Sequence, residues 1–246
     1  MQNLTNSFPD KDSKQIKRIA SDYYRFLSDL IYEGIKGMSM SKAQVLKRHK
    51  ILNPEVLLDD YYAGKSVIGV TGHYGNWEWG AFSSGIQLKH APIGFYKPLT
   101  HKYIDRFLRK RRAKFNCNLV SVKKTYETFL ENKDKVEGYI MVADQSPTKS
   151  KLDDCYWINF LNQETPCLYG PEKYAKMYNL PIYYIDIKRV KRGYYTLFIK
   201  KITDNPNSFK DGELTAICMK ELETIIKAEP KYWLWSHRRW KHKKPN

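Results

Sequence analysis

Short apolar strands alternate with helices along most of the chain, and this order constrains the fold more than any other feature. Apolar runs at residues 66–71, 93–96, 138–143 and 182–187 have the length of buried strands, and helical patterns lie between them. The alternation predicts an α/β fold with a central mixed, mostly parallel sheet flanked by helices. A further strand at 194–199, after Lys-Arg-Gly, predicts a hairpin with 182–187.

The chain is predicted to be one domain over residues 1–246. Its length is enough for a single α/β domain, and no linker rich in Pro, Gly and Ser divides it. Residues 1–64 form an N-terminal helical part, with apolar positions at three-and-four spacing over 13–36 and a second helix at 55–62. Residues 65–246 form the α/β part, which ends in a basic segment rich in Trp.

Composition excludes several classes of protein. No run approaches the roughly 18 apolar residues of a membrane-spanning helix, and the longest uncharged run, residues 66–77, contains Gly and His. The N-terminus lacks the basic-then-apolar pattern of a secretory signal. The four cysteines form no CxxC pair, which favours a reducing, cytosolic environment. Neither they nor the six histidines have the spacing of a zinc site, so we expect no metal.

Positive charge is concentrated in two segments. The formal net charge is +17, and residues 97–114 (eight basic, one acidic) and 231–246 (six basic) hold 13 of the 17 excess charges. This concentration favours a polyanionic partner, which could be nucleic acid, an anionic membrane, a phosphorylated lipid or an acidic carrier protein. A solvated helix face and a frayed basic tail would give the same counts.

The most informative motif is Gly-His-Tyr-Gly-Asn-Trp-Glu at residues 72–78. It lies where a buried strand ends and a helix begins, the edge at which open α/β sheets place ligand sites. His73 can take up and return a proton near neutral pH, and a carboxylate on its other ring nitrogen raises its basicity. Glu78 can reach it only if the backbone turns, which the two glycines permit while Asn76 caps the helix. Alternatively, His73 is a packed histidine, Asn76 a plain cap and Glu78 an acid favoured by the helix dipole.

This motif resembles the His-x4-Asp/Glu signature of the lysophospholipid acyltransferase superfamily. Its Gly-Asn-Trp-Glu ending resembles the lipid A biosynthesis (lauroyl/myristoyl) acyltransferase branch. Four further blocks are similar to that family, in the family's order and over nearly the whole chain: Asn3-Leu4 with Ser7-Phe8-Pro9, Tyr96-Lys97-Pro98-Leu99, Ala143-Asp144-Gln145 with Pro147, and the tryptophan-rich segment 233–241. The resemblance implies a lysophospholipid acyltransferase-like fold.

The resemblance implies an enzyme that acts as an O-acyltransferase without a cofactor. It would transfer a fatty acyl chain from an acyl carrier protein thioester to a hydroxyl of a lipid A precursor or related membrane lipid. His73 would act as general base on that hydroxyl and Glu78 would orient and charge-balance the imidazolium, so no Ser or Cys nucleophile is required. The acceptor could instead be an amino-acid lipid or a glycerophospholipid. A basic nucleic-acid-binding domain also fits the charge, although the family implies no nucleic-acid partner.

Several residues are predicted to hold the substrates. Lys97, Arg106 and Arg109 are candidates for phosphate contact, although the family usually has Arg where Lys97 stands, and a Lys lacks the bidentate fork. Asp144 and Gln145 follow a predicted strand, where they form either a strand-ending turn or, as the resemblance implies, part of the site. The predicted substrate-binding set is Asn76, Lys97, Arg106, Arg109, Asp144 and Gln145.

The C-terminal aromatic and basic residues predict a contact with membrane or substrate. Indole rings suit headgroup depth and cations meet anionic lipid, although the same side chains could stack on single-stranded nucleic acid. The residues are Trp233, Trp235, Arg238 and Arg239, with Trp240 and Lys241 beside them. The implied partners are acyl carrier protein, an anionic membrane surface and a phosphorylated lipid acceptor. The implied location is the cytoplasmic face of a bacterial inner membrane, with the family's apolar anchor ahead of Met1.

Overall fold

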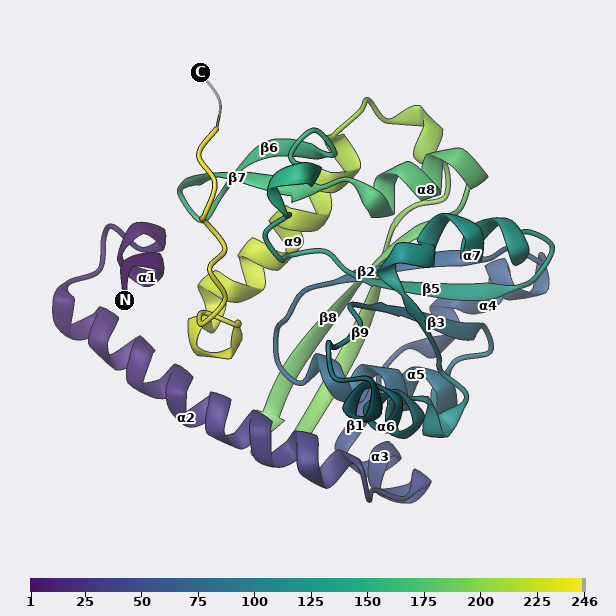
Figure 1. The fold of residues 1–246 in the computed structure, drawn as a ribbon, viewed down its shortest axis with the longest axis horizontal. Helices are drawn as coiled ribbons and strands as arrows, with labels where there is room; N and C mark the ends of the chain where they lie inside the picture. Colours follow the sequence, from purple (N-terminus) through teal and green to yellow (C-terminus); the bar gives the residue numbers. More distant parts are fainter. Residues whose placement is uncertain (245–246) are drawn as a thin grey trace.

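A seven-stranded sheet runs through the centre of the computed structural model, which describes residues 1–244 (Figure 1). The strand order is β1-β9-β8-β2-β5-β3-β4, and every neighbouring pair is parallel except the antiparallel pair β8–β9. Its strands are β1 (His49–Ile51), β2 (Val67–Thr71), β3 (Ala91–Tyr96), β4 (Asn118–Ser121), β5 (Glu137–Val142), β8 (Ile182–Lys191) and β9 (Tyr194–Thr203). The predicted mixed, mostly parallel sheet and its hairpin are confirmed. The last two residues of the predicted domain lie outside the described part.

Helices pack on both faces of the sheet, so its central strands are buried on both sides. In β8, Ile182 and Tyr184 face one apolar core, whereas Tyr183, Ile185 and Ile187 face the other. This double burial explains why the central strands read as continuous apolar runs in the sequence. The helices are α1 (Gln2–Ser7), α2 (Ser13–Gly37), α3 (Lys42–Arg48), α4 (Leu58–Tyr62), α5 (Gly80–Gln87), α6 (Lys102–Arg112), α7 (Thr125–Glu131), α8 (Gly170–Tyr178) and α9 (Glu213–Ala228).

The long helix α2 confirms the helix predicted over residues 13–36. It begins at a capping box, in which Asp12 accepts from the backbone N–H of Gln15 at 2.8 Å and the Gln15 side chain accepts from the N–H of Asp12 at 3.0 Å. Figure 1 shows α2 running past the edge of the sheet and along the C-terminal part of the chain. There Phe26 packs edge-on against Tyr232. The middle of α2 therefore lies close to the segment that follows α9.

A small second sheet was not predicted from the sequence. It is the antiparallel pair β6 (Cys155–Phe160) and β7 (Gln163–Leu168), joined by Leu161 and Asn162. Both connecting residues have positive φ, 51° and 61°, as a tight hairpin turn requires. Asn-Gly and Asp-Gly are the usual signals for such a turn, and an apolar Leu161 in the first position conceals it. The strand β1, within the N-terminal part expected to be helical, was also missed; it spans three residues.

The C-terminal segment, residues 233–240, packs into the molecule rather than away from it. Trp240 Nε1 donates to Thr165 Oγ1 at 2.7 Å, and Asn3 Nδ2 donates to the backbone oxygen of His237 at 3.2 Å. In Figure 1 this yellow segment runs between α1 and the β6–β7 pair. Within residues 1–244, none of the helices combines the length and the apolar character that crossing a bilayer requires.

Candidate active site

A cavity of about 470 Å³ lies beside the carboxyl ends of β2, β3 and β5. Most of its wall is apolar and comes from strands of the central sheet and from α5 and α6; examples are Ile140, Val142, Ile185, Leu197 and Leu108. Polar side chains also line it, among them His73, Glu78, Lys97, Arg112 and Gln145. The arrangement suits a ligand with a long apolar part and a polar reacting end.

The registry of β2 and β5 brings His73 and Asp144 together. Thr71 pairs with Val142 at the ends of these two parallel strands, so the second residue after each lies at the same edge. His73 Nδ1 is 2.5 Å from Asp144 Oδ1, and the backbone N–H of His73 donates to Asp144 Oδ2 at 2.8 Å. The Asp144 carboxylate therefore accepts hydrogen bonds from both the ring and the backbone of His73. The ring contact fixes the proton on Nδ1 and leaves Nε2 as the basic atom.

Asp144 is buried and charged, because its hydrogen bonds offset the cost of burial. Burial by itself would raise its pKa, but attraction to His73 and hydrogen bonds from His73 and Trp233 lower the pKa to about 2. Trp233 Nε1 is one of these donors, at 2.7 Å from Oδ2. For His73, burial opposes the charged ring, but the charge and hydrogen bond of Asp144 and the charge of Glu78 raise its pKa above 6.5. The site thus favours the imidazolium that a general base forms.

The basic atom of His73 faces a polar neighbour at the cavity. Gln145 Nε2 lies 3.1 Å from His73 Nε2 and can donate to it. The ring of Trp77 packs edge-on against the imidazole, with centroids 4.9 Å apart. A substrate hydroxyl that replaced the Gln145 amide would bring its proton to Nε2.

Glu78 does not make the contact with His73 that the sequence suggested. Both of its oxygens bind Arg112 of α6, with Nε–Oε2 at 2.7 Å and Nη2–Oε1 at 2.8 Å. Glu78 lies in the short 3-10 helix Trp77–Trp79, and its side chain reaches toward α6, whereas β5 delivers Asp144 to the histidine. The local i to i+5 pairing is therefore replaced by a long-range pair. Glu78 still lines the cavity, as does Arg112, which the sequence analysis had not singled out.

The turn that carries the motif has the predicted geometry at Gly75 and Asn76. Gly75 has φ +59°, and a Cβ at Gly72 would stand 2.6 Å from Leu222, so both positions favour glycine. The Asn76 side chain accepts from Trp79 N at 3.1 Å, as a cap should. Asn76 is fully buried, however, and its Nδ2 donates to Glu33 Oε2 at 2.7 Å. Asn76 therefore shapes the turn, and its predicted contact with substrate stays a prediction.

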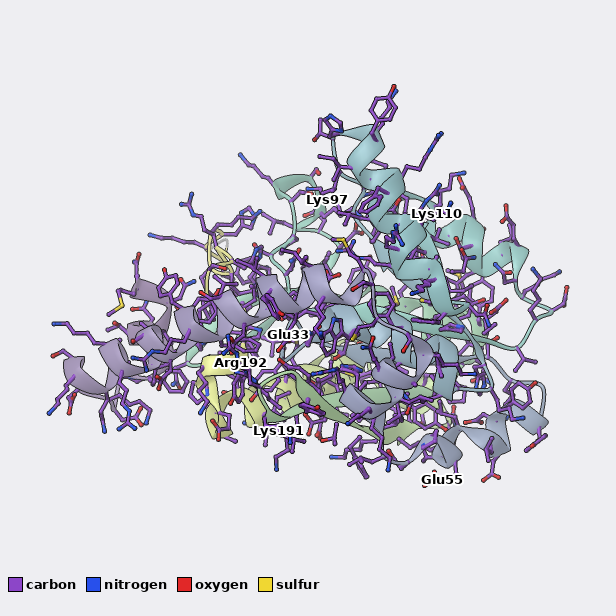
Figure 2. All side chains as sticks on the ribbon, turned by 90° about the horizontal axis from the view of Figure 1, so that it is seen from below. Glu33, Glu55, Lys97, Lys110, Lys191 and Arg192 are labelled. Atoms are coloured by element: carbon purple, nitrogen blue, oxygen red, sulfur yellow. The ribbon has the colours of Figure 1, made fainter. Side chains whose placement is uncertain are left out.

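Two buried residues, Glu33 and His49, support this turn, and neither was predicted from the sequence. Glu33 of α2, labelled in Figure 2, also accepts from the Tyr195 hydroxyl at 2.8 Å. His49 Nε2 donates to the backbone oxygen of Asn76 at 3.0 Å. Burial lowers the pKa of His49 to about 3, so this ring is neutral near pH 7. A charged residue on the apolar face of α2 was the available signal for Glu33.

Exchanging the carboxylate and the amide of the Glu33–Asn76 pair gives a stability test. Asn76→Asp puts a second carboxylate against Glu33 in a buried place, and we expect it to lower the free energy of unfolding by about 3 kcal/mol. Adding Glu33→Gln restores one carboxylate facing one amide and should recover roughly half of that loss or more. Urea unfolding measures both variants. A double variant no more stable than Asn76→Asp alone would show that the two side chains are not coupled.

The basic residues predicted to bind phosphate are only partly brought together. Lys97 lines the cavity, whereas Arg106 and Arg109 are exposed on α6 and do not line it. The side of α6 that faces the cavity carries Leu108 and Arg112 instead. Helical periodicity sets this choice, because residues four apart share a face. Gln145 lines the cavity. Asp144, the preceding residue, does not line the cavity and contacts His73 instead.

The C-terminal residues predicted to contact membrane or substrate lie mostly inside the molecule. Trp233, Trp235 and Arg239 are buried, and only Arg238 of the predicted group is exposed. The indole nitrogens and Arg239 Nη2 find partners inside the molecule, whereas Arg239 Nε and Nη1 are buried without a hydrogen-bond partner among the described residues. Trp235 Nε1 donates to the backbone oxygen of Pro230 at 2.6 Å, and Arg239 Nη2 donates to that of Pro166 at 2.9 Å. These hydrogen bonds offset part of the free-energy cost of burying side chains that are otherwise common at an interface.

A cysteine nucleophile does not fit the cavity. Cys117 lines it, but burial raises the pKa of this thiol to about 11, so it is not a thiolate near neutral pH. Within the described residues, no three His, Cys, Asp or Glu side chains are grouped to hold a metal ion. The chemistry that the arrangement supports is proton abstraction by His73, with Asp144 holding the ring.

Comparison with known families agrees with the motifs. A family described as bacterial lipid A biosynthesis acyltransferase matches residues 1–242. No curated protein matches the chain.

Proposed function

Because the chain belongs to the bacterial lipid A biosynthesis acyltransferase family and is therefore an acyltransferase, we propose that it acylates a lipid A precursor or a related membrane lipid. The proposed donor is an acyl carrier protein thioester, and the acceptor group is a hydroxyl. The observation that carries the proposal is the geometry of His73. Its Nδ1 is held by a buried carboxylate and its Nε2 is directed to a mostly apolar cavity.

The proposed reaction needs one base and no covalent enzyme intermediate. His73 Nε2 takes the proton of the acceptor hydroxyl while the hydroxyl oxygen attacks the thioester carbonyl. The tetrahedral intermediate then collapses, the C–S bond breaks, and the departing thiolate takes the proton back from His73. Asp144 holds the ring and stabilises the imidazolium between the two proton transfers.

Charged side chains of the cavity serve the polar ends of the substrates. Lys97 and Arg112 line it and supply positive charge for the oxyanion or for a phosphate of the acceptor. Glu78 holds the Arg112 guanidinium through two hydrogen bonds, so its proposed role is to position that cation and to add to the charge that favours the imidazolium. This replaces the direct His73–Glu78 pairing expected from the sequence.

The acidic carrier protein, a phosphorylated lipid and an anionic membrane are the proposed partners, at the cytoplasmic face of the inner membrane. The net charge of +17 supports them by charge complementarity. An amino-acid lipid or a glycerophospholipid remains the alternative acceptor within the same chemistry. The nucleic-acid alternative has lost its main support, since Trp233, Trp235 and Arg239 are buried and cannot stack on bases.

An acyl-transfer assay tests the proposed function. The protein is incubated with acyl carrier protein thioesters of several chain lengths and a panel of lipid acceptors, and the products are identified by mass spectrometry. We expect a lipid A precursor to gain the mass of one acyl chain, with one chain length preferred. Transfer to a glycerophospholipid or an amino-acid lipid alone would move the assignment to that acceptor. Absence of transfer from every thioester would overturn the proposed donor.

A further inference from the structure

Helix α6 exposes its apolar side chains to solvent. Tyr103, Ile104 and Phe107 are 81%, 50% and 47% exposed, and none of the eleven residues of the helix is buried. The spacing of these three side chains puts them on one face of the helix. A helix gains most of its stability from packing an apolar face, so an exposed apolar face is a candidate contact surface.

Cations surround this apolar face. Figure 2 shows α6 standing out from the body of the molecule, with Lys97 and Lys110 labelled beside it. The single acid of the segment, Asp105, is used locally, because it accepts from the Tyr96 hydroxyl at 3.0 Å and from Leu99 N at 2.8 Å. The basic residues of α6 are Lys102, Arg106, Arg109, Lys110, Arg111 and Arg112, and Arg112 is paired with Glu78. The surface thus combines exposed apolar side chains with a high density of positive charge.

The apolar face of α6 lies beside the mouth of the active-site cavity. Leu108 and Arg112 of the same helix line that cavity. Leu99 and Val122 line it as well, and both are also exposed to solvent. A lipid that moved from the outer face of α6 over the rim into the cavity would therefore contact apolar side chains along the whole path.

We propose that α6 docks on an anionic lipid bilayer, with Tyr103, Ile104 and Phe107 inserted among the lipid headgroups. Its cations then meet the anionic lipids, and an acceptor lipid enters the cavity past Leu99 and Val122. The proposal rests on the proposed function for its lipid substrate. A bilayer is favoured over an acidic protein because the apolar face leads into a cavity that must take up a lipid chain. Contact with a bilayer requires exposed basic and aromatic side chains. Helix α6 has them, whereas the C-terminal tryptophans are buried.

Helix α2 supplies a matched control. Its side chains Tyr24, Ile31 and Ile35 are 62%, 62% and 64% exposed, comparable to those of α6. No residue of α2 lines the cavity. A general effect of removing exposed apolar side chains would therefore be the same for both helices, whereas docking through α6 would not.

The test is flotation of the intact chain with vesicles of phosphatidylglycerol and phosphatidylcholine. We expect the triple variant Tyr103→Ser, Ile104→Ser, Phe107→Ser to lose roughly tenfold or more in vesicle partitioning. The control triple variant Tyr24→Ser, Ile31→Ser, Ile35→Ser should stay within about twofold of the unmodified chain. Pure phosphatidylcholine vesicles and high salt should both weaken binding of the unmodified chain. Circular dichroism and thermal unfolding verify that both variants fold.

Three outcomes would overturn the proposal: no vesicle binding by the unmodified chain, equal binding by the α6 variant, or an equal loss in the α2 control. A loss of acyl carrier protein binding in the α6 variant, with vesicle binding intact, would overturn it in favour of a protein partner. Flotation requires no catalysis, so it separates this proposal from the proposed function. If transfer occurs, the α6 variant should lose rate with acceptor in vesicles and keep it with acceptor in detergent.

Discussion

His73→Ala is expected to reduce acyl transfer by about three to four orders of magnitude while the protein remains folded. The substitution removes the imidazole ring, whose Nδ1 is held by Asp144 and whose Nε2 is directed to the cavity. The fold should persist because the backbone N–H of His73 still donates to Asp144 at 2.8 Å. Single-turnover transfer from a thioester measures the loss, with the thermal unfolding midpoint as the control. Retention of more than a few per cent of the rate would remove His73 from the role of base.

Asp144→Asn is expected to cost nearly as much, by about three orders of magnitude, and to change the pH dependence as well. An amide no longer stabilises the imidazolium and no longer fixes the proton on Nδ1. In the unmodified protein the pKa of His73 lies above 6.5, so the neutral, basic form and the rate increase as the pH rises through that value. Without the charge of Asp144, the pKa of His73 falls, and the acid limb of the pH–rate profile moves to lower pH.

Glu78→Gln is the control for this second prediction. Glu78 is bound to Arg112 and acts on His73 only through its charge, so its removal should shift the acid limb less than Asp144→Asn does. The profile of kcat/KM against pH reports the pKa of His73 in the free enzyme for each variant. If Glu78→Gln abolished transfer and Asp144→Asn were nearly harmless, Glu78 would regain the role that the sequence motif suggests.

The sequence predicted the turn that carries His73 but paired this residue with Glu78, whereas in the structure it contacts Asp144. The apolar run before residue 72 and the glycines after it predicted a strand, a turn and a helix, and all three are present. The pairing with Asp144 depends on which strand lies beside β2 and in which register, with Thr71 opposite Val142. Such a contact joins residues 71 positions apart, and no local pattern encodes it.

Burial was the second property that local patterns could not supply. Trp233 and Arg239 are residue types common at interfaces, but here Trp233 Nε1 and Arg239 Nη2 find partners on distant segments, at Asp144 and Pro166. Conversely, the concentration of basic residues at 97–114 was evident from the sequence, but the exposed apolar face of the helix α6 within it was not. Whether a side chain is covered depends on tertiary neighbours, and residues such as Trp and Arg are stable in either setting.

The hydrogen bond from Trp233 to Asp144 has a consequence for how the enzyme matures on the ribosome. Trp233 lies 89 residues after Asp144 in the chain, and synthesis proceeds from the N-terminus at about 5–20 residues per second. Until the segment after α9 has left the exit tunnel and docked, Asp144 lacks one of the donors that keep it charged. The set of hydrogen bonds around Asp144 is therefore completed late in synthesis. A nascent chain that already contains the whole His73 motif is expected to be a poor catalyst until that moment.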